Sequence, residues 1–258
     1  MSLLIANVVP EGLVFAADRN LSSEGQVVGN APKLVKWHDP PLVAGYVGIA
    51  EVDGSPMHEW LHGFFERHAH DALEAIGPQL ADTLEDASRR LSQADRGTIV
   101  HVGGFEDSSE GPRPVIWYVR DAQIETDGSV RHLERFKARD ELKQSGRRPP
   151  YFGGASGAEI RRILREADTP LPWAGFRQSF DLGVFGRLDQ LLQQFEAELA
   201  LGGHARATEH RAPATLAEWE PFVKMSVLCY AAYFEAFYPP GQQLVGGGVD
   251  VETIEWPA

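Results

Sequence analysis

The chain has 258 residues, and 43% of them are hydrophobic, which is enough to bury a large core. We expect one domain over residues 1–258. The formal net charge of −13 argues against nucleic acid or an anionic membrane as a partner, because both require a basic face. The single cysteine, Cys229, excludes an internal disulfide framework, and no stretch is typical of a signal peptide or a membrane span. A cytoplasmic protein is therefore expected.

Two strands are predicted at the start of the chain. Residues 3–9 form a continuous apolar run, residues 10–12 are a Pro-Glu-Gly break, and residues 13–17 form a second apolar run that ends in Asp18. Antiparallel pairing across this turn would bring Asp18 back beside Ser2. Removal of the initiator methionine would leave Ser2 with a hydroxyl and a free α-amine on one carbon. Since an α-amine has a pKa of about 8, it can act as the base for that hydroxyl.

Lys33 opens the next apolar stretch, residues 34–37, and can pair with Asp18 while lowering the proton affinity of the Ser2 hydroxyl. Spacing alone favours an ordinary structural ion pair between Lys33 and Asp18. A further strand is predicted over residues 42–48, Leu-Val-Ala-Gly-Tyr-Val-Gly. The serine, the lysine and the carboxylate together are the parts of an activated nucleophile.

The middle of the chain alternates helices and strands. Ser55 and Pro56 begin a helix with one apolar face, and a second helix is predicted over residues 78–92. Four strand candidates follow: residues 98–105, 114–119, 122–126 and 129–136. Residues 137–148 carry many charges and are expected to be a solvated excursion.

The last part of the chain is mainly helical. Helices are predicted over residues 158–167, 186–201 and 216–238, an irregular loop over residues 168–185 and a final strand over residues 247–254. Strands, paired helices, strands, paired helices and a last strand are typical of an α+β fold with two antiparallel sheets stacked between helical layers. The sequence therefore predicts a four-layer αββα sandwich.

A zinc-binding motif occurs in the first predicted helix. Residues 58–62 read His-Glu-Trp-Leu-His and match H-E-x-x-H, in which two histidines one helical turn apart bind zinc and the glutamate is a general base. His68 has the spacing of a third ligand, but the extended motif requires a glycine where Phe65 stands. We favour a helix that continues with a solvated polar face, no metal and no other cofactor. A zinc peptidase that uses His58, Glu59 and His62 is an alternative.

The first fifty residues resemble the β-type subunits of proteasomes and their simpler bacterial relatives, which are N-terminal nucleophile hydrolases. The nucleophile position falls on Ser2, where the family usually has threonine, the acidic position on Asp18 and the lysine on Lys33. The glycine whose N–H stabilises the oxyanion falls on Gly45. The resemblance also implies a side-chain pocket lined by apolar residues, and so an apolar residue before the scissile bond: Leu21, Ala31, Val35, Val43 and Val47.

Two positions depart from the family's pattern. The arginine two residues beyond the acidic position is Asn20 here, next to Arg19. The aspartate and serine that hold the N-terminal amine in the family fall near residues 242–245, where neither residue type occurs. A catalytically inactive ring or scaffold subunit is therefore an alternative to an active peptidase.

The resemblance implies hydrolysis of peptide bonds in a peptide or an unfolded protein, through an acyl-enzyme on Ser2. It also implies a homo-oligomeric ring that confines the nucleophiles in a chamber, and it leaves room for an ATPase partner. Aromatic side chains of the first and last long helices either form the subunit interface or fill the core of the monomer: Trp60, Phe64, Phe65, Tyr230, Tyr233, Phe234, Phe237 and Tyr238.

Overall fold

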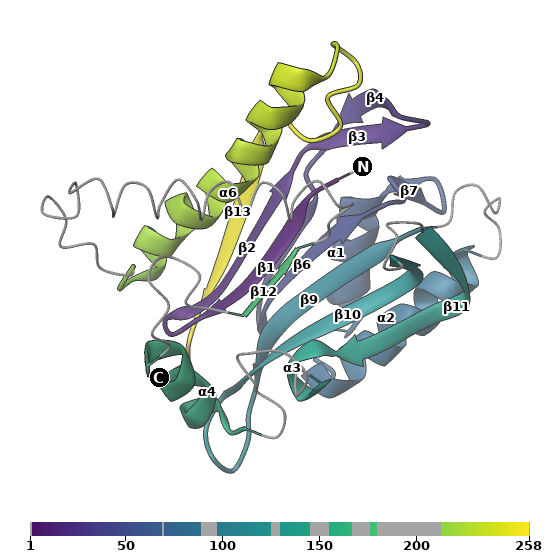
Figure 1. The fold of residues 1–258 in the computed structure, drawn as a ribbon. Coiled ribbons are helices and arrows are strands. Elements are labelled where there is room, and N and C mark those ends of the chain that lie inside the picture. The colour runs from purple at the N-terminus through teal and green to yellow at the C-terminus, as the bar shows by residue number, and fades with distance from the viewer. Residues whose placement is uncertain are drawn as a thin grey trace, which may run out of the picture.

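The computed structural model describes residues 2–68, 70–88, 97–124, 130–144, 155–166, 176–179 and 213–257. Within these residues the strands pair antiparallel into sheets and the helices pack on the faces of the sheets (Figure 1). This confirms the α+β class that the order of the elements predicts. The helix expected over residues 186–201 lies outside the described residues.

The first sheet has four strands in the order β12-β1-β2-β13. Its strands are β1 (Leu4–Val9), β2 (Gly12–Asp18), β12 (Phe176–Ser179) and β13 (Val249–Glu255). β1 and β2 form the predicted hairpin, and a Cβ at Gly12 would lie 2.0 Å from the Ile254 carbonyl oxygen, so only glycine lets β13 approach this turn. β12 corrects the expectation of an irregular loop over residues 168–185, because part of that stretch pairs with the edge of β1.

The second sheet has five strands in the order β11-β10-β9-β6-β5. They are β5 (Leu34–His38), β6 (Pro41–Val47), β9 (Ile99–Glu106), β10 (Arg113–Ile124) and β11 (Val130–Asp140). The two strands expected over residues 114–126 are one strand, β10, whose register with β11 shifts beside Asp121. Asp121 is buried there and accepts the backbone N–H groups of Gly97 and Thr98, so the irregularity satisfies its carboxylate.

The charged stretch over residues 137–148 is not a solvated excursion in its described part. It continues β11 to Asp140 and then forms the short helix α3 (Glu141–Gln144). Asp140 is 4% exposed and pairs with Arg113 at 3.3 Å. Partners on neighbouring strands, which the local sequence does not reveal, make this burial possible.

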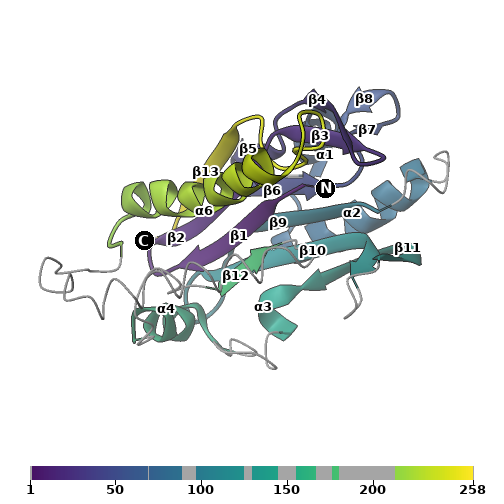
Figure 2. The same cartoon turned by 45° about the horizontal axis from the view of Figure 1, so that its top comes forward.

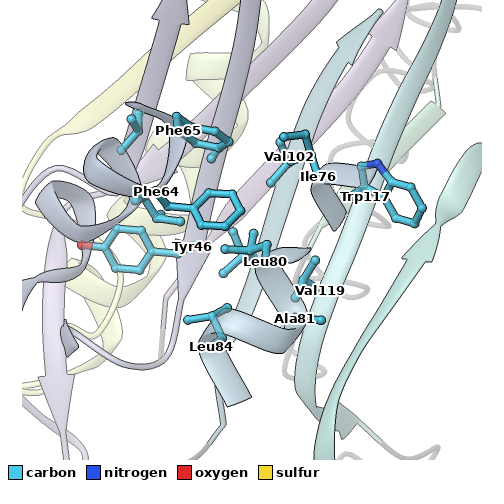
Figure 3. Close-up of a cluster of buried hydrophobic side chains, with 14 of the residues drawn as sticks. Tyr46, Phe64, Phe65, Ile76, Leu80, Ala81, Leu84, Val102, Trp117 and Val119 are labelled. Carbon is cyan, nitrogen blue, oxygen red and sulfur yellow. The ribbon is translucent and has the colours of Figure 1, made fainter. Parts of the chain in front are cut away.

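Two helices, α1 (Met57–His68) and α2 (Leu73–Ser88), cover one face of the five-stranded sheet. Figure 3 shows their apolar side chains against those of the strands, in a core that includes Tyr46, Phe64, Phe65, Leu80, Val102 and Val119. α2 begins at Leu73, five residues before the expected start at Pro78. Packing of Ile76 in this core outweighs the hydrogen bond that a proline inside a helix removes.

Side chains of β1 and β2 alternate between two other cores. Leu4, Ala6 and Val8 pack with Val43 and Ile99 of the five-stranded sheet in a core that also takes up Ile160 and Leu164 of helix α4 (Gly157–Glu166). The opposite face, with Leu3, Ile5 and Val14, packs against Trp219, Tyr230 and Phe234 of helix α6 (Leu216–Phe237). Figure 2 shows α6 lying along β2 and β13, while α2 lies by the other sheet. No helix among the described residues is long and apolar enough to cross a bilayer.

Two small hairpins complete the end of the molecule where β1 begins. The first joins β3 (Asn20–Ser23) to β4 (Gln26–Asn30), and the second joins β7 (Glu51–Val52) to β8 (Ser55–Pro56). Figure 1 and Figure 2 both show the N-terminus close to β3 and β7. The residues after the ends of β2 and β6 thus surround the start of the chain.

Candidate active site

The β1–β2 hairpin brings Ser2 and Asp18 together. Leu4 pairs with Ala17, so the next residues outward, Leu3 and Asp18, lie opposite each other. The Asp18 N–H donates to the Leu3 carbonyl at 3.2 Å, and the Leu3 N–H donates to Asp18 Oδ1 at 2.8 Å. The short turn fixes this register. Ser2 therefore follows directly on a backbone segment that the Asp18 carboxylate holds.

Lys33 precedes β5 and reaches into the same place. Its Nζ donates to Ser2 Oγ at 2.9 Å, to Asp18 Oδ1 at 2.8 Å and to the Asn20 carbonyl at 2.6 Å. Lys33 is only 1% exposed, so water competes little with these three acceptors for the hydrogens of its ammonium group. An ammonium group has three hydrogens, and the three oxygens account for all of them. The arrangement suits the protonated lysine.

Donors surround the Asp18 carboxylate on both oxygens. Besides Lys33 and Leu3 on Oδ1, the N–H groups of Asn20 and Gly246 each donate to Oδ2 at 3.2 Å. Burial raises the pKa of Asp18 and lowers the pKa of Lys33, while the attraction between the two groups opposes both shifts. Four donors on one carboxylate and three acceptors on one ammonium favour the ionised pair.

A glycine-rich loop before β13 closes the site from the C-terminal side. The Gly246 carbonyl accepts the N–H groups of Arg19 and Asn20, at 2.9 and 3.1 Å. The Asn20 side chain donates to the Gln243 carbonyl at 2.7 Å, and the Asn30 side chain donates to the Gly247 carbonyl at 2.6 Å. Sequence reasoning missed Asn20 and Gly246, because their roles depend on how two distant loops meet.

The two departures from the family pattern have structural counterparts. Arg19 forms an ion pair with Asp250 of β13, at 3.6 Å, rather than with Ser2. In the stretch where the family has an aspartate and a serine, Gln243 supplies a backbone carbonyl and Val245 packs in the core under α6. Near the site, this chain thus has a backbone carbonyl and a core side chain in the stretch where the family has an aspartate and a serine.

A pocket of about 600 Å³ opens beside Ser2 and Lys33. Of the five residues expected to line it, Leu21 and Val47 do so. Val35 instead packs in the core beneath the helices and Val43 in the core between the sheets, because β5 and β6 direct these side chains to the faces of the sheet. Ala31 is not among the lining residues either. The pocket also has polar walls, so the expected apolar lining holds only in part.

Gly45 does not line this pocket. It lies within β6 opposite His101 of β9, and a Cβ there would lie 2.5 Å from Leu4 Cδ1, in the core between the sheets. The Tyr46 N–H donates to the Lys33 carbonyl. Because N–H directions alternate along a strand, the Gly45 N–H faces β9 rather than Ser2.

Gly48, just after the end of β6, lines the pocket together with Ser2. Its φ is 104°, and a Cβ would lie 2.3 Å from the Gly97 carbonyl oxygen, so the position requires glycine. The following N–H, of Ile49, donates to Thr98 Oγ1 at 3.2 Å. Among the residues that the structure describes, the Gly48 N–H has no hydrogen-bond partner. It is a backbone donor that the pocket can offer to a ligand.

The histidines of α1 lie apart from this site. The helix continues to His68 through Phe65, as predicted. His58 lies 3.9 Å from Glu59, and the His62 ring makes an edge contact with Trp37. His68 pairs with Asp71 at 3.1 Å and lies against Phe64. Among the described residues, no three metal-binding side chains form a cluster suited to an ion.

Ser2, Lys33 and Asp18 at one end of two packed antiparallel sheets have the side-chain set of a nucleophile with its activators. No family model and no curated protein matches the chain. Solved structures do match it over almost its whole length, and three structures of Anbu are among them.

Anbu from Hyphomicrobium sp. strain MC1 has 14% identity, with 98% of this chain and 82% of that chain covered and a TM-score of 0.47. A Gly-1 mutant of the same protein has 15% identity, coverage of 99% and 82%, and a TM-score of 0.49. Anbu from Yersinia bercovieri, described as an ancestral beta-subunit, has 14% identity, coverage of 98% and 81%, and a TM-score of 0.48.

Proposed function

We propose that the protein is a hydrolase that cleaves peptide bonds with Ser2 as an N-terminal nucleophile. The observation that carries the proposal is the hydrogen bond from the buried Lys33 Nζ to Ser2 Oγ, at 2.9 Å. A positive charge at this distance favours the alkoxide over the hydroxyl and so lowers the pKa of the Ser2 hydroxyl. Asp18 holds Lys33 in place at 2.8 Å.

The direction of this hydrogen bond also decides where the hydroxyl proton goes. Ser2 Oγ accepts from Lys33, which leaves its own hydrogen free for a base. Once the initiator methionine is removed, the Ser2 α-amine is that base. Ser2 Oγ then forms a bond to the substrate carbonyl carbon while the amine takes the proton.

The negative charge that develops on the carbonyl oxygen needs a donor. The Gly48 N–H, which lines the pocket, is better placed for this role than the Gly45 N–H, which faces β9. The carbon–nitrogen bond breaks as the Ser2 amine gives its proton to the leaving amine. Water then cleaves the acyl ester by the same transfers in the opposite direction and restores Ser2.

The packing of the elements supports the same class of enzyme. We propose that the two sheets, with α1 and α2 outside one and α6 outside the other, form the four-layer αββα sandwich of N-terminal nucleophile hydrolases. We propose further that several copies assemble into a homo-oligomer. Restricted access suits a nucleophile in an open pocket, because an assembly can keep folded proteins away from it.

The test compares variants at position 2 on a panel of fluorogenic peptides. Ser2→Ala removes the nucleophile and is expected to lower kcat to background, whereas Ser2→Thr keeps a hydroxyl and is expected to retain activity. Ser108→Ala, on an exposed turn, is the matched control for loss of a serine hydroxyl. Intact mass spectrometry establishes in parallel whether the chain begins at Ser2.

Two outcomes would overturn the proposal. Hydrolysis that survives in Ser2→Ala would place the nucleophile elsewhere. A wild-type protein that lacks the initiator methionine, assembles and still cleaves no peptide would favour the inactive ring or scaffold subunit.

A further inference from the structure

Three carboxylates line the pocket that holds Ser2. Glu24 lies at the tip of the β3–β4 hairpin, and Glu51 and Asp53 lie on the β7–β8 hairpin. Glu24 and Asp53 have positive φ values of 50° and 53°, and each is followed by a glycine. This conformation is typical of tight hairpin turns, so the positions of these two carboxylates follow from their turns.

The three carboxylates reach the same pocket from two sides. Figure 1 and Figure 2 both show the N-terminus close to β3 and β7. All three side chains belong to exposed residues, whereas Lys33 at the bottom of the pocket is 1% exposed. The negative charge is therefore at the mouth of the pocket and the nucleophile is deeper.

The wall between the mouth and the nucleophile is apolar in part. Leu21 and Val47 line it, half-buried and buried respectively, and Val28, which is 66% exposed, lines the pocket nearer to its mouth. An apolar wall below a carboxylate rim matches a side chain with a long aliphatic stem and a cationic head. Lysine and arginine are the residues with that form.

The charge of Lys33 does not neutralise the rim. Its three hydrogens are directed to Ser2, Asp18 and Asn20, and Asp18 lies beside it as a counter-ion. Lys33 is the only cationic side chain among the described residues that line the pocket. A substrate therefore meets a negative rim, and the net charge of −13 strengthens attraction for cations at long range.

We propose that this pocket selects substrates with a lysine or arginine side chain beside the scissile bond, with Glu24, Glu51 and Asp53 as specificity-determining residues. The inference rests on the proposed function, because it assigns a substrate class to the same site. The sequence predicts a purely apolar pocket, whereas this inference gives the pocket a negatively charged rim. A single exposed ion pair contributes little free energy. The three carboxylates together are therefore expected to give a preference of about tenfold for a cationic side chain over a neutral one.

The kinetic test uses two peptides that differ in one residue, lysine in one and norleucine in the other, before a fluorogenic leaving group. Wild-type kcat/KM is expected to be about tenfold higher for the lysine peptide, and the ratio is expected to fall with added salt. Glu51→Gln is expected to lower the ratio, and the combined change with Glu24→Gln and Asp53→Asn to bring it close to one. Glu235→Gln, on the exposed face of α6, is the matched control and leaves the ratio unchanged.

A binding measurement separates this inference from the proposed function. Calorimetry with Ser2→Ala compares the affinities of the lysine and norleucine peptides without any turnover. Tighter binding of the lysine peptide that is lost in the triple variant supports the inference even if the wild type hydrolyses nothing, in which case only the proposed function fails. The inference is overturned if the lysine and norleucine peptides have equal affinities in calorimetry and equal kcat/KM values with the wild type. Thermal melting confirms that each variant is folded.

Discussion

At the scale of single residues, the candidate site depends on a lysine that is almost fully withdrawn from water. Burial lowers the pKa of Lys33 below its ordinary value of 10.5, and the carboxylate of Asp18 acts in the opposite direction. Loss of hydration, which favours the neutral amine, and the charge of Asp18, which favours the ammonium, thus oppose each other. The protonation state of Lys33 is consequently sensitive to changes in its partners.

The pH dependence of kcat/KM is expected to have two limbs. Activity rises with pH as the Ser2 α-amine, with an ordinary pKa of about 8, loses its proton and becomes a base. It falls again as Lys33 loses its proton, at a pH below 10.5 because burial lowers that pKa. Asp18→Asn removes the attraction that raises the Lys33 pKa, so the alkaline limb is expected to move to lower pH and kcat to fall.

Two further variants calibrate this measurement. Asp250→Asn removes a weaker attraction for Lys33 and is expected to move the alkaline limb in the same direction by less. Glu252→Gln changes a carboxylate on the same strand that pairs with Lys36, and it is expected to leave the profile unchanged. An alkaline limb that stays in place in Asp18→Asn contradicts the role given to Lys33.

The sequence predicts part of the site because that part depends on local structure. Asp18 lies opposite Leu3, and so next to Ser2, across a hairpin whose turn is visible in the sequence, and Lys33 opens the next strand. Asn20 and Gly246 were missed, since more than two hundred residues separate them along the chain. The position of Gly45 depends on the phase of β6 relative to β9, which apolar patterning alone does not determine.

At the scale of elements, the contact between α2 and β10 requires one glycine. A Cβ at Gly77 would lie 2.2 Å from the Trp117 ring, and Trp117 Nε1 also donates to the Leu73 carbonyl at 2.8 Å. Helix and strand are therefore as close as their backbones and this indole allow. The close approach also explains why a helix that contains Pro78 is retained there.

Gly77→Ala is expected to destabilise the protein by about 1–3 kcal/mol, because the methyl group overpacks the contact and forces α2 away from the sheet. Gly63→Ala in α1 is the matched control, since the nearest atom to its Cβ is Arg67 Nη1 at 3.6 Å. That change is expected to stabilise by up to about 1 kcal/mol, because alanine favours the helix. Urea denaturation gives both free energies of unfolding, and equal effects at the two positions would contradict the packing argument.

Most element types follow from the sequence, whereas several boundaries do not. Apolar runs and turns identify β1, β2, β5 and β6, because each run is bounded by residues that break strands. The start of α2 and the continuity of β10 depend on tertiary contacts, with Trp117 for the first and with Gly97 and Thr98 for the second. β12 has only four residues, too few for a clear period, and its partner β1 decides its structure.

At the scale of the whole molecule, the aromatic side chains of the long helices divide between core and surface. Phe64, Phe65, Tyr230 and Phe234 are buried in the monomer, which rules them out as an interface. Phe237 remains 71% exposed on α6, together with Met225 at 46% and Leu228 at 48%. Met225 and Leu228 lie three residues apart and therefore on one face of α6, and neighbouring exposed apolar side chains are typical of a surface that another protein covers.

If copies of this chain assemble through α6, two charges on that face are expected to disrupt the assembly. Met225→Glu combined with Leu228→Glu is expected to lower the mass measured by light scattering after size exclusion, with no large loss of stability because both positions are exposed. Glu110→Lys places a charge change on an exposed turn outside α6 and is expected to leave the mass unchanged. An oligomer of the same mass in both variants excludes α6 as the contact.

The hydrogen bond from the Gly246 N–H to Asp18 also has a consequence for biosynthesis. Chains are made from the N-terminus, so Ser2, Asp18 and Lys33 leave the ribosome long before residue 246. Until then Asp18 lacks one of its donors, and β2 lacks its neighbour β13. A nascent chain therefore carries the proposed nucleophile, Ser2, before all the groups around it are in place. The order of translation itself delays the assembly of the site until residue 246 has been made.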